Sequence, residues 1–188
     1  MENEFPSIPD YSSQILSPDG SDKVLLLDWV GKFFYLELLY SSNIHGQNVS
    51  TFHKRCDNKS LTLTLYKSKN GRRFGGFTYL TFSSVNQFVK GNGEDFIFSL
   101  DTRKMFKNNK DLIYSLYNNL NFFPTFGYPS DLYIHKDCFK HNTSYSSFPT
   151  SYGHGTNEPN ADNTYFAGTK NFLLDLIEVY QVIFDEEN

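Results

Sequence analysis

Residues 61–82 read LTLTLYKSKNGRRFGGFTYLTF, and this stretch decides the fold because it holds two apolar runs on either side of a turn. In the first run, Leu61, Leu63 and Leu65 alternate with threonine and tyrosine. A period of two is typical of a strand with one face in the core, so we expect the leucines to point inward and the threonines to face water. Asn70-Gly71 between the runs predicts a hairpin with a type I′ turn.

The return strand contains Phe74-Gly75-Gly76-Phe77. Glycine has no side chain to pack in a strand, so this pair indicates a β-bulge or the close approach of another part of the chain. A phosphate loop is excluded, because the Gly-x-x-x-x-Gly-Lys-Ser/Thr order is missing and the segment does not precede a helix. We therefore interpret the two phenylalanines as structural anchors.

Lys69, Arg72 and Arg73 form a basic cluster at the hairpin tip. Such a cluster is usually only solvated, but it can also contact an acidic surface of another protein. We predict these three residues as partner-binding residues. The N-terminal arm and the polar segment 141–164 are the other expected contact regions, because loops commonly carry recognition.

Further strands are expected on both sides of the hairpin. They cover residues 33–40, 95–100, 112–117, 122–126, 131–134 and 171–184. The last of these is apolar on both faces, which predicts a central position in a sheet. Two short helices are expected, one from Ser17-Pro18 to Gly31 and one capped by Ser50. Residues 141–164 are rich in Ser, Asn, Thr, Gly and Pro, which predicts a long surface loop.

This order of elements predicts an α+β fold in which two antiparallel β-sheets pack as a sandwich with short flanking helices. We expect a flexible arm over residues 1–13 and a single domain over residues 14–188. The chain has 188 residues, and its 19 Phe and 13 Tyr are enough to build one large core.

Composition also limits the function. The net charge is −4 and no basic tract stands out, which argues against nucleic-acid binding. No apolar run approaches the roughly 20 residues of a membrane helix and no signal peptide is visible, so we expect no direct membrane insertion. The two cysteines, Cys56 and Cys138, fit a reducing compartment, so we expect a cytoplasmic protein.

Two groups of residues have spacings that a zinc site could use. They are His53 with Cys56, and His135 with Cys138 and His141. We favour a packing role for the cysteines and solvent exposure for His135 and His141, and we expect no metal, no cofactor and no catalytic residue. A thiol that handles peroxide stays open as an alternative, because basic residues adjoin both cysteines.

Glu178 lies inside the apolar C-terminal strand. A carboxylate at such a position must be paired or must point out of the core. We expect a hydrogen bond or an ion pair that fixes the sheet, with Arg72, Arg73 or Lys170 as the candidate partner. A general acid–base role would need a second convergent carboxylate in a cleft.

Several blocks of the sequence resemble the TLDc domain family, in the order in which that family has them. Residues 38–46 (LLYSSNIHG) with the following segment from Ser50 to Cys56 are similar to its opening, and residues 61–77 to its central hairpin. Residues 95–100 (DFIFSL), Phe126-Gly127 with Asp131, and residues 177–180 (IEVY) are similar to its later blocks. The family often has tryptophan in place of the tyrosine that ends IEVY, and a second glycine where residues 128–130 read YPS.

The resemblance implies a non-enzymatic, protein-binding module with a sandwich fold. Members of the family are tied to oxidative-stress resistance, and several bind the peripheral sector of the vacuolar proton ATPase and regulate its assembly. We expect the chain to be this domain alone, which would reach a vacuolar or lysosomal membrane surface, or cilia, through a partner. A structural subunit of a cytoskeletal or ciliary assembly is the alternative. The residues that match the family's structural motif are Phe74, Gly75, Gly76, Phe77, Gly127, Asp131 and Glu178.

Overall fold

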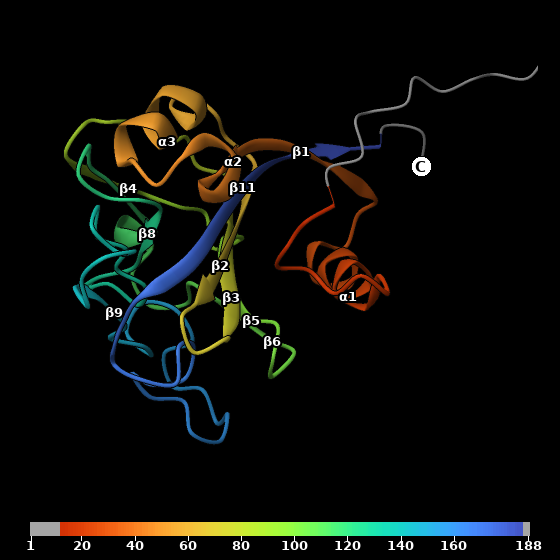
Figure 1. The fold of residues 1–188 in the computed structure, drawn as a ribbon. Coiled ribbons are helices and arrows are strands. Elements are labelled where there is room, and N and C mark those ends of the chain that lie inside the picture. Colours follow the sequence, from red (N-terminus) through yellow and green to blue (C-terminus); the bar gives the residue numbers. More distant parts are fainter. Residues whose placement is uncertain (1–11, 186–188) are drawn as a thin grey trace, which may run out of the picture.

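The computed structural model describes residues 12–185, and its central element is a six-stranded antiparallel sheet with the order β1-β11-β2-β3-β5-β6. In Figure 1 this sheet runs through the middle of the molecule, with α1 on one side and α3 and the smaller strands on the other. The C-terminal strand lies between β1 and β2, so its predicted central position is confirmed. The strands are β1 Phe34–Ser41, β2 Thr62–Ser68, β3 Arg73–Thr78, β5 Phe96–Ser99, β6 Lys104–Lys107 and β11 Leu174–Phe184.

Smaller elements flank this sheet within residues 12–185. A three-stranded sheet contains β4 Gln87–Val89, β7 Leu116–Asn118 and β8 Thr125–Phe126, and a two-stranded sheet pairs β9 Ser144–Tyr145 with β10 Asn171–Phe172. The helices are α1 Ser21–Val30, α2 Ser42–His45, α3 Val49–Cys56 and the 3-10 helix η1 Leu112–Tyr114. The predicted α+β class with layered antiparallel sheets is confirmed.

Both faces of the six-stranded sheet are buried. On one face, Leu63 and Leu65 of β2 pack in a cluster with Leu26 of α1. On the other face, Tyr66 packs in a second cluster that includes Phe126 of the small β8 strand. The sheet therefore separates two hydrophobic cores, one beneath α1 and one beneath the second layer of strands.

The threonines of β2 do not face water as we expected. Thr62 and Thr64 are fully buried, because the face that they share with Tyr66 is covered by the second layer. The period of two in the sequence correctly separated the two faces of the strand. It could not show that a polar face would also be covered, since the covering residues are far away in the sequence.

The predicted hairpin is confirmed, but its turn type is not. Of the Asn70-Gly71 pair, only Gly71 has a positive φ, of 88°, whereas a type I′ turn needs a positive φ at both positions. The Gly71 N–H donates to the carbonyl of Ser68, and the Ser68 N–H donates to the carbonyl of Arg72. The loop is thus a three-residue turn that ends in a left-handed glycine, which is also a common hairpin connection.

The segment Phe74-Gly75-Gly76-Phe77 forms most of β3. Its two phenylalanines are buried in opposite clusters, Phe74 beneath the second layer and Phe77 on the α1 side. β2 and β3 pair in continuous register, so the predicted bulge is absent from this pair. The other predicted reason for the glycines, a close approach of neighbouring groups, is correct.

The close approach comes from both faces of β3. A Cβ atom on Gly75 would lie 2.1 Å from the carbonyl oxygen of Thr64 and 2.7 Å from Cζ of Phe98. A Cβ atom on Gly76 would lie 2.5 Å from Cζ of Phe126. The two glycines therefore let aromatic rings from either core rest directly on the backbone of β3.

Two helices begin at other residues than we predicted. α1 begins at Ser21 rather than directly after Ser17, whose backbone N–H donates to the Asp22 carboxylate at 2.7 Å. α3 is capped by Asn48, whose side chain accepts from the N–H of Ser50, so Ser50 is inside the helix. The residue before α1 is Gly20, which gives no side-chain cap, so neither predicted serine caps its helix.

Three further predictions need correction. Residues 112–117 begin as η1 and only then become β7, and residues 131–134 form isolated bridges rather than a strand. The segment 141–164 is not simply a surface loop, because Phe148 and Tyr152 are buried within it. Its aromatic side chains pack into the core beneath the second layer. The polar composition of the segment gave no sign of this packing.

Replacing Gly75 with alanine is expected to lower the free energy of unfolding by about 3 kcal/mol, because a backbone atom blocks the added methyl group. Urea denaturation followed by circular dichroism measures this change. The matched control is Gly155→Ala, where nothing lies within 4 Å of the added atom and φ is 70°. That control should lose only about 1 kcal/mol from backbone strain. Equal losses in the two variants would contradict the close approach at β3.

Candidate functional site

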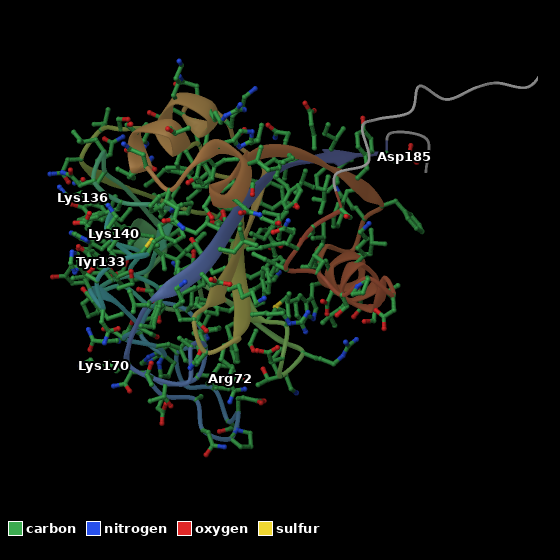
Figure 2. The ribbon with its side chains drawn as sticks, viewed as in Figure 1. Arg72, Tyr133, Lys136, Lys140, Lys170 and Asp185 are labelled. Carbon is green, nitrogen blue, oxygen red and sulfur yellow. The ribbon has the colours of Figure 1, made fainter. Side chains whose placement is uncertain are left out.

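The basic hairpin tip offers less free charge than its sequence suggested. Lys69 Nζ lies 3.0 Å from Asp175 Oδ1 in an exposed ion pair. Arg72 is exposed at the tip (Figure 2), whereas Arg73 is half-buried and contacts the buried Asp22. Of the three predicted partner-binding residues, Arg73 has an evident internal role, and the tip alone does not form a site.

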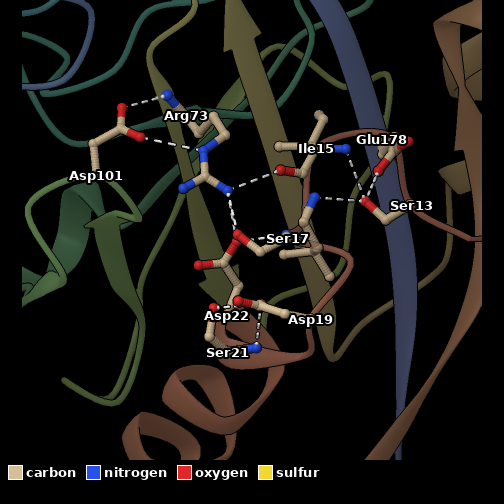
Figure 3. Close-up of polar contacts among 10 residues, drawn as sticks. Ser13, Ile15, Ser17, Asp19, Ser21, Asp22, Arg73, Asp101 and Glu178 are labelled. Carbon is tan, nitrogen blue, oxygen red and sulfur yellow. Dashed lines mark hydrogen bonds and ion pairs between the residues drawn. The ribbon is translucent and has the colours of Figure 1, made fainter.

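Arg73 joins β3 to the segment before α1, as Figure 3 shows. Its Nη1 donates to Asp22 Oδ2 at 2.6 Å and to the carbonyl of Ile15 at 3.2 Å, and its Nε donates to Asp101 Oδ1 at 3.2 Å. Burial lowers the pKa of Arg73, but the hydrogen bonds and charges of Asp22 and Asp101 outweigh this effect and raise it. The guanidinium therefore stays charged and links three segments.

Glu178 lies in the middle of β11, is fully buried, and anchors the same N-terminal segment. It accepts hydrogen bonds from Ser13 Oγ at 2.5 Å, from the Gln14 N–H at 3.0 Å and from the Tyr180 hydroxyl at 3.0 Å. The expected hydrogen bonding of this carboxylate is thus present, whereas Arg73, one of the expected cations, binds Asp22 instead. We call residues 13–20 the N-terminal strap.

The strap changes our expectation of a flexible arm over residues 1–13. Residues 1–11 lie outside the described part of the chain, but Ser13 is fixed to Glu178. Ile15 and Leu16 are buried on the α1 side of the sheet. The domain therefore uses two buried acids, Glu178 and Asp22, to hold a segment that has no regular secondary structure.

Asp131 anchors another irregular segment. Its carboxylate accepts from the backbone N–H groups of Thr150, Ser151 and Tyr152, at 2.6, 3.0 and 3.2 Å. Burial raises the pKa of Asp131, and these hydrogen bonds offset only part of the increase. Gly127 is needed beside it, because φ is 81° and a Cβ atom there would lie 1.9 Å from the Asp131 carboxylate.

Both cysteines are buried, and His53 has a structural partner. Burial raises the pKa of Cys56 to about 12 and also raises the pKa of Cys138. His53 Nδ1 lies 2.8 Å from Asp57 Oδ1, so this histidine stabilises the end of α3. Within residues 12–185, no three His, Cys, Asp or Glu side chains are grouped so that they could hold a metal ion.

A surface of aromatic side chains was not predicted from the sequence. Its neighbouring rings lie at centroid distances of 4.9 Å (Phe88–Tyr114), 4.5 Å (Phe88–Tyr117), 5.7 Å (Tyr117–Phe122), 4.8 Å (Phe122–Tyr133) and 4.6 Å (Tyr133–Tyr145). All of these rings are half-buried. We call this continuous row the aromatic ridge; it comprises Phe88, Tyr114, Tyr117, Phe122, Tyr133 and Tyr145.

The ridge lies on the small strands of the second layer and on the loops that join them. Tyr128, which is 53% exposed, extends it through a stacked contact with Tyr114 at 4.8 Å. Burial, and then the nearby Tyr145 and Tyr117, raise the pKa of Tyr133 to about 12, so its hydroxyl stays neutral at physiological pH. Contiguous exposed apolar surface is typical of an interaction site, and the ridge is therefore our candidate.

The only sequence signal for the ridge was the general abundance of Phe and Tyr. Its members come from five separate segments, and tertiary pairing brings them together.

A pocket of about 380 Å³ is lined in part by residues that follow Tyr133 of the ridge closely in the chain. It lies between the start of α3 and the turn that follows His135. The lining residues are Gln47, Asn48, Val49, Lys136, Asp137, Phe139 and Lys140.

Substituting Arg73 with glutamine is expected to lower the free energy of unfolding by about 2 kcal/mol, because Asp22 would stay buried without its cation. The loss is below that of a fully buried pair, since the Arg73 side chain is 24% exposed. Lys69→Gln is the control, because it breaks an exposed ion pair and should change stability by less than about 1 kcal/mol. Chemical denaturation measures the free energy of unfolding of both variants. Equal losses in the two variants would contradict the anchor role of Arg73.

Both thiols are expected to resist modification in the native protein. A pKa of about 12 for Cys56, against about 8.5 for a free thiol, slows thiolate chemistry on the order of a thousandfold at neutral pH. Reaction with a chromogenic disulfide reagent, with and without denaturant, measures the difference. Fast reaction of the folded protein would revive the peroxide-handling alternative.

No helix within residues 12–185 combines the length and apolar character needed to cross a membrane. A comparison with curated proteins finds no match for the chain. A family model described as TLDc domain matches residues 10–183, and this range includes all three anchoring acids, the glycine pair of β3 and the aromatic ridge. Since the match covers nearly all of its 188 residues, the chain belongs to the TLDc domain family, the oxidation-resistance family.

Proposed function

We propose that the chain is a non-enzymatic module that binds the peripheral, soluble sector of the vacuolar proton ATPase in the cytoplasm. By binding one assembly state of the pump more tightly than another, it would shift the population toward that state. Resistance to oxidative stress would follow from the altered pump. Membership in the TLDc family supports this proposal.

The observation that carries a binding role is the half-buried aromatic ridge at the surface. The buried carboxylates described above have internal partners: Glu178 and Asp22 hold the strap, and Asp131 holds the segment around Ser151. The ridge, in contrast, presents half-buried rings to solvent. Tyrosine is enriched among the side chains that dominate binding energy at protein interfaces.

The proposal predicts direct binding of the purified chain to the purified peripheral sector of the pump. Tyr114→Ser removes a ring from the ridge and is expected to weaken that binding at least about tenfold. Tyr35→Ser is the matched control, because Tyr35 is 47% exposed on β1 of the six-stranded sheet and contributes no ring to the ridge. Biolayer interferometry gives the dissociation constants.

A wild-type chain that does not bind the peripheral sector would refute the ATPase proposal. Specific co-sedimentation with cytoskeletal filaments or ciliary fragments in the same series would replace it with the structural-subunit alternative. Equal effects of Tyr114→Ser and Tyr35→Ser would remove the ridge from the interface.

A further inference from the structure

We propose that the aromatic ridge and the adjoining pocket form one docking surface for an acidic protein segment that carries an aromatic side chain among its carboxylates. This inference rests on the proposed binding function and adds the chemistry of the partner. The partner's aromatic ring would pack on the ridge near Tyr133. Its carboxylates would face Lys136 and Lys140 in the pocket.

The ridge and the pocket are joined through His135. The His135 ring lies 6.3 Å from the ring of Tyr133 and 6.2 Å from that of Phe122, so it continues the ridge. The next residues in the chain, Lys136 and Asp137, line the pocket. An extended segment of a few residues could therefore contact both features without a break.

The charges around this junction favour an acidic partner. Lys136 and Lys140 line the pocket, and Lys170 precedes the strand that pairs with Tyr145. Figure 2 shows these three lysines and Tyr133 along one side of the molecule. All three lysines are exposed, and none has an ion-pair partner in the described part of the chain.

Some other lysines are already neutralised by a neighbouring carboxylate. Lys69 is paired with Asp175, and Lys107 with Glu94. The acidic member of the pocket, Asp137, lies 3.6 Å from His135 Nδ1. Two unpaired lysines beside one carboxylate leave the pocket with a net positive charge, and complementary charge is what orients a partner on such a surface.

The ring geometry favours a protein segment over a nucleic acid. Single-stranded nucleic acids bind by stacking bases on free aromatic faces. In the ridge, rings stack on each other instead: Tyr133 on Tyr145 with an interplanar angle of 22°, and Phe88 on Tyr117 with an angle of 26°. Each of these rings has one face covered by its neighbour, whereas edges and grooves between rings suit a side chain.

The test uses the purified full chain and a fluorescent random copolymer of glutamate and tyrosine, with binding followed by fluorescence anisotropy. The double substitution Lys136→Glu and Lys140→Glu should weaken binding at least about tenfold. The matched control, Lys23→Glu with Lys32→Glu, makes the same change in charge at exposed lysines on the α1 side and should stay within about twofold. Circular dichroism confirms that each variant is folded. Equal losses in the two double variants would overturn the proposed surface.

A single substitution in the aromatic ridge tests whether the ridge binds the aromatic side chain of the partner. Tyr133→Ser should weaken binding of the glutamate–tyrosine copolymer about tenfold and leave binding of polyglutamate unchanged. Equal losses for the two polymers would overturn the role of the ridge. Oligothymidylate is the third probe, and binding of it as tight as that of the copolymer would replace the protein partner with a nucleic acid.

These measurements are independent of the pump. Copolymer binding with the predicted sensitivities, together with no binding to the peripheral ATPase sector, would keep the docking surface and reject the ATPase as the partner. Conversely, a Lys136→Glu and Lys140→Glu variant that still binds the ATPase sector with wild-type affinity would leave the proposed function standing and overturn the acidic-segment proposal.

Discussion

The close contact between aromatic rings and the backbone of β3 is the constraint on which the rest of the structure depends. Gly75 and Gly76 leave no side chain above or below the strand, so Phe98 and Phe126 approach it from opposite faces. The second layer, through Phe126, can then lie directly on the sheet. This layer also carries the small strands from which the aromatic ridge projects.

Irregular segments cover much of the sheet, and buried carboxylates hold them in place. Glu178 and Asp22 fix the N-terminal strap, and Asp131 fixes the segment around Ser151. A segment without regular secondary structure must satisfy its backbone N–H groups in some other way, and a carboxylate that accepts several of them does so efficiently.

The sequence predicted the parts of the fold that depend on local pattern. The alternating leucines from Leu61 to Leu65 gave the hairpin, and the apolar run ending at Phe184 gave the central strand, because each pattern lies within one element. The aromatic ridge could not be predicted, since Phe88 and Tyr145 become parts of one surface only after distant strands pair. Arg73 was assigned to a partner contact for the same reason, because its internal partner Asp22 lies 51 positions away in the sequence.

The central position of β11 has a consequence for how the protein is made. β1 and β2 appear early in the chain, but the strand between them ends only at Phe184. During synthesis, the edges of β1 and β2 that will contact β11 therefore stay unpaired until β11 has been made. Open strand edges of this kind can associate with other chains. Completion of the sheet depends on contacts that are remote in sequence, which makes folding slow.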